Sequence, residues 1–171
     1  FQYILMNRNE LHLNCDLGEA TKKEAQIMNY IQGCTIACGG HYSDSRSVYQ
    51  TLSKAVDLGI EVGAHPSYPD FENFGRASIN LDKEAFFSSM RQQLDLYFDQ
   101  LSKLKAENNH IKAHGALYND LSVNEELCTW FLEIIESYPH KTLYTPFNGS
   151  LADLAKESNR PVSFEAFIDR N

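Results

Sequence analysis

Residues 33–65 read GCTIACGGHYSDSRSVYQTLSKAVDLGIEVGAH, and this stretch decides the fold class. Its two ends, Gly33–Cys38 and Ile60–Ala64, are short and largely apolar, which is typical of buried strands. Between them, apolar positions recur at helical spacing after a candidate N-cap, Asp44 or Ser45, until a glycine ends the pattern. Because a helix is the favoured crossover between parallel strands, the stretch predicts a strand–helix–strand unit.

The same alternation extends in both directions. Further strands are predicted at Leu11–Cys15, His110–Ala113, Thr142–Thr145 and Pro161–Ala166, and further helices at Lys22–Tyr30, Leu81–Leu101, Asn124–Ser137 and Ser150–Glu157. Residues 65–76 show neither periodicity, and Pro and Gly punctuate them. A loop of this length in a compact protein is typically functional. Six strands that alternate with helices predict the α/β class.

The length and composition fit one domain over residues 1–171. A hydrophobic fraction of 43% is enough for a buried core at this size. Met6 is a plausible native start, so residues 1–5 are interpreted as a leader or added residues. The chain stops at Asn171 directly after a strand-like run, so we expect it to be truncated at its carboxyl end.

The charge and the cysteines bear on partners and location. Fifteen basic against 23 acidic residues give a net charge of −8, which repels nucleic-acid backbones and anionic lipid surfaces. No apolar run approaches the roughly 20 residues that cross a bilayer. Four dispersed cysteines do not form a disulfide framework, so a reducing cytoplasm is expected. Nucleic acid and membranes are therefore not expected as partners.

Polar side chains follow four of the predicted strands. The carboxyl ends of parallel strands meet at one edge of a sheet, where such folds build their sites. The candidates are Asp16 with Glu19, His41 with Asp44, His65 with Asp70 and Arg76, and Lys112 with His114. His12, His110 and His140 lie outside this pattern and are interpreted as structural.

Two kinds of chemistry fit these residues. A carboxylate and imidazoles can hold a divalent metal with a bound water, and the ligand set proposed from the sequence is Asp16, His41 and His65. The same groups can act as general acid and base without a metal, and their spacing does not decide between the two.

Cys34 and Cys38 have no second pair to complete a zinc site, so they are interpreted as buried thiols. Alternation points Cys15 away from the neighbouring carboxylate, so it is not expected to be a nucleophile.

Five motifs at these loops resemble the successive signatures of one known family, the LamB/YcsF family. They are Leu13-Asn14-Cys15-Asp16-Leu17-Gly18-Glu19, Ile36-Ala37-Cys38-Gly39 with His41, Gly63-Ala64-His65-Pro66 with Tyr68-Pro69-Asp70, Phe74-Gly75-Arg76, and Lys112 with His114-Gly115-Ala116-Leu117-Tyr118-Asn119. The resemblance runs from about Glu10 to the carboxyl end. As a set, the motifs are highly specific.

The resemblance implies a fold and an activity. The fold would be a deformed β/α barrel of the glycoside hydrolase/deacetylase type. The activity would be that of the A subunit of ATP-dependent 5-oxoprolinase, which opens 5-oxo-L-proline to L-glutamate with partner subunits B and C. This chain lacks a phosphate-binding loop motif, so ATP is expected to act through the complex. Phosphorylation of the lactam carbonyl oxygen would provide the leaving group that the unreactive amide lacks.

Residue roles follow as hypotheses. Asp16 is assigned as general base or metal ligand, His41 and His65 as ligands or proton shuttles, and His114 as general acid. Lys112 and Arg76 would bind the substrate carboxylate or a phosphorylated carbonyl, because cations suit both. Substrate contacts are also expected from three further residues, Asn14, Glu19 and Tyr118.

Two other functions stay open. One is a deacetylase or amidohydrolase that uses a divalent metal and works alone, for which the metal content is the discriminating observation. The other is a non-catalytic subunit that only presents the substrate.

The sequence also departs from the family pattern, which typically has Phe at Gly40, Gly at Ser43 and Ser67, Pro at Ala113 and Arg at Ala77. None of these changes removes an ionisable residue of the motifs, so they affect loop shape more than chemistry.

Overall fold

The computed structural model describes residues 12–167, and its centre is one parallel β-sheet. The six strands are β1 Asn14–Leu17, β2 Gly33–Ala37, β3 Glu61–His65, β4 His110–Lys112, β5 Thr142–Pro146 and β6 Val162–Glu165. Each strand pairs with the next one in the chain, and every pairing is parallel. This sequential order winds the sheet in one direction, as a β/α barrel does. The predicted α/β class and barrel-type arrangement are confirmed.

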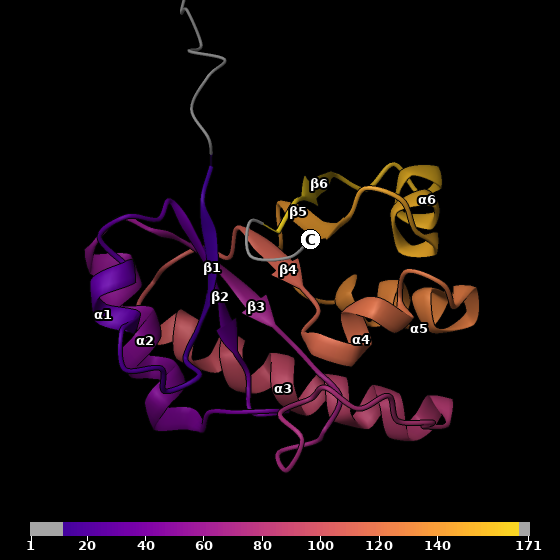
Figure 1. The fold of residues 1–171 in the computed structure, drawn as a ribbon, viewed down its shortest axis with the longest axis horizontal. Coiled ribbons are helices and arrows are strands. Elements are labelled where there is room, and N and C mark those ends of the chain that lie inside the picture. The colour runs from indigo at the N-terminus through magenta and orange to yellow at the C-terminus, as the bar shows by residue number, and fades with distance from the viewer. Residues whose placement is uncertain (1–11, 168–171) are drawn as a thin grey trace, which may run out of the picture.

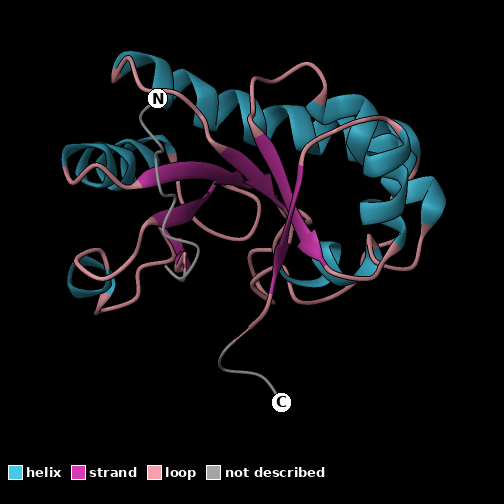
Figure 2. Ribbon diagram, turned by 90° about the horizontal axis from the view of Figure 1, so that it is seen from above, coloured by secondary structure: helices cyan, strands magenta, loops and turns pink. Residues whose placement is uncertain are grey.

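The helices form a layer outside the strands. They are α1 Glu24–Ile27, α2 Ser45–Asp57, α3 Lys83–Lys103, α4 Gly115–Asp120, α5 Glu125–Ile135 and α6 Ser150–Glu157. In Figure 1 they follow one another along an arc, in which α2 packs on α3, α3 on α5 and α5 on α6. Figure 2 shows the strands fanned out inside this arc. Within the described residues, no helix combines the length and the apolar character that a membrane span needs.

The two faces of the sheet have different environments because successive side chains of a strand point to opposite sides. One face carries buried apolar side chains, among them Leu17, Ile36, Val62, Ile111 and Leu143. These belong to the hydrophobic core that includes helix residues such as Leu52, Met90 and Phe131. The other face carries polar side chains, and the site lies on that face.

Three of the six helix starts in the described residues follow from local capping. The side chains of Asp44, Asp82 and Asn124 accept hydrogen bonds from backbone N–H groups at the starts of α2, α3 and α5. Helix α1 is shorter than the predicted Lys22–Tyr30. Helix α4 was not predicted, because six residues are too few to show helical periodicity. The interpretation of residues 1–5 as a leader lies outside the described residues.

His110 on β4 is a buried aromatic group rather than a member of the site. Its ring stacks on Tyr144 with the centroids 4.1 Å apart, and neither ring nitrogen has a hydrogen-bond partner among the described residues. A Cβ at Gly63 would lie 2.3 Å from this ring, so the glycine provides the space that the imidazole occupies. Burial, with the charge of Lys112 as the next contribution, lowers the pKa of His110 to about 3.

His110→Phe is expected to weaken the pH dependence of stability. The unfolded chain binds a proton at His110 below about pH 6.5, whereas the folded protein binds it only near pH 3. The free energy of unfolding therefore falls as the pH drops through this window, by up to about 1.4 kcal/mol per pH unit for this residue. Phenylalanine keeps the stacking and removes the titration. Urea unfolding between pH 4 and 7 would measure the slope, and an unchanged slope would contradict the assignment.

Candidate active site

A cluster of polar side chains lies at the carboxyl edge of the sheet, as the sequence predicts. Strands β1, β3 and β4 contribute three of its members, and the residues that follow β1, β2 and β4 contribute the others. The cluster consists of Asp16, Glu19, His41, His65, Lys112 and His114. All five residues predicted as catalytic are therefore brought together, and Glu19 joins them.

The carboxylates of Asp16 and Glu165 form a cage around the ammonium group of Lys112. Its Nζ donates to Asp16 Oδ1 at 2.9 Å and lies 3.1 Å from Glu165 Oε1, and only 5% of its side chain is exposed. Burial alone would lower the pKa of Lys112, but Asp16 and Glu165 outweigh it and raise the pKa. Lys112 is therefore a fixed cation, held by carboxylates from the two edge strands β1 and β6.

Asp16 is the partly open member of the cluster, with 32% of its side chain exposed. Its Oδ1 accepts hydrogen bonds from Lys112 and from the hydroxyl of Thr35, while Oδ2 lies 3.4 Å from His65 Nε2. Burial would raise the pKa of Asp16, but the nearby His65, Lys112 and Thr35 hold it well below its usual range. A carboxylate this acidic is a weak base, so its charge rather than its basicity is what it brings to the site.

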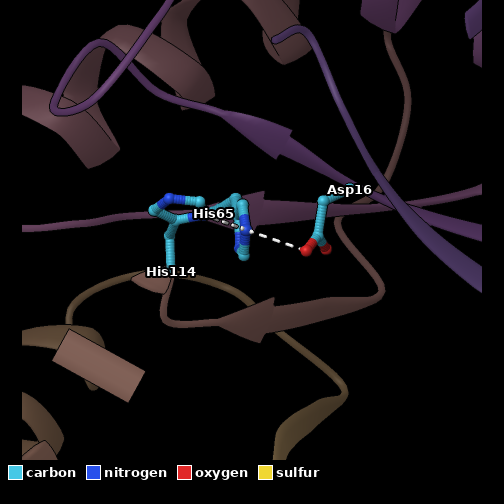
Figure 3. Close-up of side chains that lie close together, drawn as sticks. All are labelled: Asp16, His65 and His114. Atoms are coloured by element: carbon cyan, nitrogen blue, oxygen red, sulfur yellow. Dashed lines mark hydrogen bonds and ion pairs between the residues drawn. The ribbon is translucent and has the colours of Figure 1, made fainter. Parts of the chain in front are cut away.

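His65 and His114 face each other, as Figure 3 shows. His65 Nδ1 donates to the carbonyl of Lys112 at 2.8 Å, and His114 Nε2 donates to the carbonyl of Phe74 at 2.9 Å. Each of these nitrogens must carry the proton, because a carbonyl oxygen only accepts. The remaining nitrogens, His65 Nε2 and His114 Nδ1, point at each other across 3.0 Å. Burial, then His65 and His41, lowers the pKa of His114 to about 3, so its ring is neutral at pH 7.

His41 packs against the ring of His114. The two rings stack with centroids 3.6 Å apart and planes within 4° of parallel. His41 is fully buried, and its Nε2 pairs with Glu19 Oε1 at 2.8 Å. Burial lowers the pKa of His41, although the hydrogen bond to Glu19 opposes this shift. Glu19 also lies 3.4 Å from His114 Nδ1 and thus connects both histidines.

The loop after β3 provides the carbonyl that holds His114. Phe74 has φ of 56°, a conformation that non-glycine residues seldom adopt, and Gly75 follows with φ of 64°. The N–H of Ala116 donates to Gly75 O at 2.9 Å. A Cβ at Gly115 would lie 2.4 Å from the same oxygen, so Gly115 permits the close contact between this loop and α4. The loop predicted as functional therefore shapes the site through its backbone.

The other residues predicted from the sequence are not among the six members of the cluster. Asn14 is two residues before Asp16 on β1, and its buried amide has no hydrogen-bond partner among the described residues. Arg76 is exposed, with its guanidinium carbon 5.4 Å from the centre of the Phe74 ring. Tyr118 donates to Glu165 Oε2 at 3.3 Å and so contacts the cage of Lys112. Asp44 caps α2, and Asp70 accepts hydrogen bonds from Asn73 within its own loop.

Two contributors to the site were missed from the sequence. Thr35 lies directly opposite Asp16 in the register of β1 and β2. The sequence did offer a signal for it, because Thr35 is a polar residue within the apolar run 33–38. Glu165 is the acid in the last apolar run, but nothing in the sequence indicates that β6 lies within reach of Lys112. Thr35 contacts Asp16 on β1, and Glu165 contacts Lys112 on β4, so each acts on the site through a residue of a different strand.

The cysteines behave as predicted for buried thiols. Cys34 and Cys38 are fully buried, and burial raises the pKa of each to about 12. Burial and the neighbouring Asp16 also raise the pKa of Cys15, to about 11. Thiols this weakly acidic are poor nucleophiles at neutral pH.

One of the departures from the family pattern has a structural explanation. A Cβ at Gly40 would lie 2.2 Å from Gln93 Oε1 and 2.4 Å from Ser67 Oγ. The amide of Gln93 is itself fixed, because it accepts from the N–H of Ser67 and donates to the Ser67 carbonyl. The hydroxymethyl group of Ser67 and the amide of Gln93 therefore occupy space that a larger residue at position 40 would need.

Comparison with known proteins agrees with these motifs. The model of the LamB/YcsF family matches residues 11–171. The chain belongs to the LamB/YcsF family. Among curated relatives, it is 35% identical to the protein of Thermococcus sibiricus that is named as the A subunit of 5-oxoprolinase, over 94% of this chain and 66% of the relative. It is 30% identical to the protein of the same name from Vibrio cholerae, over 96% of this chain and 70% of that one.

The structure of this LamB/YcsF family member also resembles a solved one. The crystal structure of the lactam utilization protein from Thermus thermophilus superposes with a TM-score of 0.87 at 26% identity. The match covers 94% of this chain and 68% of that protein. The chain thus spans about two thirds of the length of the relatives that it matches.

Proposed function

We propose that this chain is the A subunit of an ATP-dependent 5-oxoprolinase and takes part in opening 5-oxo-L-proline to L-glutamate. The observation that carries the proposal is that the motifs of the family contain the residues that form the candidate active site. Relatives named as 5-oxoprolinase A subunits match most of the chain, and the family motifs contribute the six residues that converge at the carboxyl edge of the sheet. A hydrolase-type role follows from the same names.

The chemistry requires an activated lactam. In the proposed sequence, the γ-phosphoryl group of ATP is transferred to the lactam carbonyl oxygen, a first water adds to that carbon, and the C–N bond breaks to give the acyl phosphate of glutamate. A second water then hydrolyses the acyl phosphate and releases phosphate. ATP is bound through partner subunits B and C. The atoms balance as one lactam, one ATP and two waters giving glutamate, ADP and phosphate.

The geometry suggests how this chain contributes. The fixed cation of Lys112 can stabilise negative charge on the carbonyl oxygen or on a phosphoryl group. His114 is neutral at pH 7 and carries its proton on Nε2, which donates to the carbonyl of Phe74, so the role of general acid assigned from the sequence is disfavoured. Arg76, exposed beside Phe74, remains a candidate for the substrate carboxylate. The amide of Asn14 makes no hydrogen bond to the cluster or to any other described residue, so nothing in the cluster orients it toward a substrate.

The test is glutamate formation from 5-oxoproline with ATP. The expected result is no product from this chain alone and glutamate with ADP when subunits B and C are added. Glutamate production by subunits B and C without this chain would contradict the proposal. A reaction that removes acetyl groups from a model acetamide, without ATP or partners, would instead establish the deacetylase alternative.

A further inference from the structure

We infer that Asp16 Oδ2, His65 Nε2 and His114 Nδ1 form a binding site for one divalent transition-metal ion, with zinc-like preference and an open position for water or substrate. These three atoms lie within 4.8 Å of one another. The sequence alone suggested Asp16, His41 and His65. The geometry favours His114 in place of His41.

The first argument is the orientation of the two imidazoles. Hydrogen bonds to the carbonyls of Lys112 and Phe74 fix the protons on the outward nitrogens, so two lone pairs face each other across 3.0 Å. Two opposed lone pairs repel unless a cation lies between or beside them. Ring N–H groups anchored on backbone carbonyls are also the usual support of metal-bound histidines.

The second argument is the spacing of the atoms. Metal–ligand bonds of about 2.0–2.1 Å place neighbouring ligands about 3.3–3.4 Å apart in a tetrahedron and about 2.9–3.0 Å apart in an octahedron. The observed separations are 3.0 Å between the two nitrogens and 3.4 Å from His65 Nε2 to Asp16 Oδ2. The second separation is longer than an ordinary hydrogen bond and equals the spacing of two ligands of one tetrahedral ion.

The third argument is charge. Asp16 and Glu165 pair with the cation Lys112, and Glu19 lies 3.4 Å from His114 Nδ1, so the formal charges of these four groups sum to +1 − 3 = −2. Asp16 presents its two oxygens separately, Oδ1 to Lys112 and Thr35, and Oδ2 to the histidines. A divalent ion at Oδ2 therefore does not compete with the lysine for the same oxygen. Two imidazole nitrogens and one carboxylate oxygen are ligands typical of catalytic zinc.

A second group, Glu19, His41 and His114, is also close enough to hold an ion. Its central contact, His41 Nε2 to Glu19 Oε1, is 2.8 Å, which is the length of an ordinary hydrogen bond. If His41 donates there, it has no lone pair to give at that nitrogen. The second group is therefore interpreted as support for His114 rather than as a separate site.

The experiment is a titration of the purified, metal-stripped protein with Co²⁺, followed by visible absorption and calorimetry, with Zn²⁺ as competitor. The expected result is one ion per chain and an affinity at least about 100-fold lower in His65→Ala and in His114→Ala. Asp16→Asn, which preserves volume, provides a third ligand variant in case an alanine variant does not fold. Circular dichroism would establish folding in each case.

Two histidine variants serve as controls. His12 is exposed and pairs with Glu61 at the opposite end of β1, so His12→Ala should bind as the wild type does. His41→Asn should bind one ion with an affinity about 10-fold lower, at the low end of the range for supporting residues, because His41 contacts the ligand His114 by ring stacking. Absence of stoichiometric binding in the wild type would overturn the inference and favour a shared proton. A loss in His41→Asn as large as that in His65→Ala would overturn the assignment of ligands.

The inference does not rest on the proposed reaction, because a bound metal could polarise the carbonyl of a lactam or of an acetamide. Binding is measured without substrate, ATP or partner subunits. Failure of the metal titration would therefore leave the lactam-opening role untouched, and failure of glutamate formation would leave the metal site untouched.

Discussion

Asp16→Asn is expected to lower the rate of glutamate formation by about 10³-fold in the mixture that contains ATP and both partner subunits. The substitution keeps the size of the side chain but removes the negative charge. That charge pairs with Lys112 at 2.9 Å and faces His65 at 3.4 Å, so its loss changes the position of both side chains. The measurement is the initial rate of glutamate release at saturating ATP.

The matched control for this variant is Asp57→Asn. Asp57 is exposed at the end of α2 and takes no part in the cluster, so its amide variant should retain the wild-type rate. Circular dichroism and the unfolding midpoint would show whether Asp16→Asn is folded. A folded Asp16→Asn variant with the wild-type rate would remove Asp16 from the reaction.

Lys112→Met is expected to cost about 2–4 kcal/mol of folding stability. Methionine fills most of the volume but leaves the carboxylates of Asp16 and Glu165 without their cation. Glu165 is only 13% exposed, so its charge is poorly hydrated, whereas Asp16 is 32% exposed and recovers part of its hydration. This partial exposure places the expected loss below the upper range for fully buried pairs. Urea unfolding at pH 7 would measure it.

Lys141→Met is the matched control. Lys141 pairs with Glu107 at 3.0 Å, but the side chains are 63% and 80% exposed. Exposed pairs typically contribute less than about 1 kcal/mol, so this variant should unfold close to the wild type. Equal losses in the two variants would show that the cage around Lys112 adds no specific stability.

The lysine variant also separates stability from chemistry. If Lys112 only holds β1, β4 and β6 together, glutamate formation should recover when Lys112→Met is assayed under stabilising conditions such as low temperature or added osmolyte. If its charge acts on the substrate, the rate stays low although the protein is folded.

Local signals in the sequence determined the elements and which residues reach the edge of the sheet. Short apolar runs such as Ile60–Ala64 predict strands because a buried strand can be apolar on both faces, and Asp44 predicts a helix start because its side chain satisfies free N–H groups. In parallel strands, the residues after each run necessarily meet at one edge. The gathering of Asp16, His65 and His114 was therefore predictable without coordinates.

Only the tertiary structure decided how these residues pair. The lone pairs of His65 and His114 face each other because two backbone carbonyls, one of them from Phe74 in a rarely adopted conformation, fix the orientation of the rings. Glu165 reaches Lys112, more than 50 residues earlier in the chain, because β6 packs beside β5. Periodicity describes the spacing within one element. It contains no information on the angle of a side chain or on the register between strands, and those two quantities set the contacts of this site.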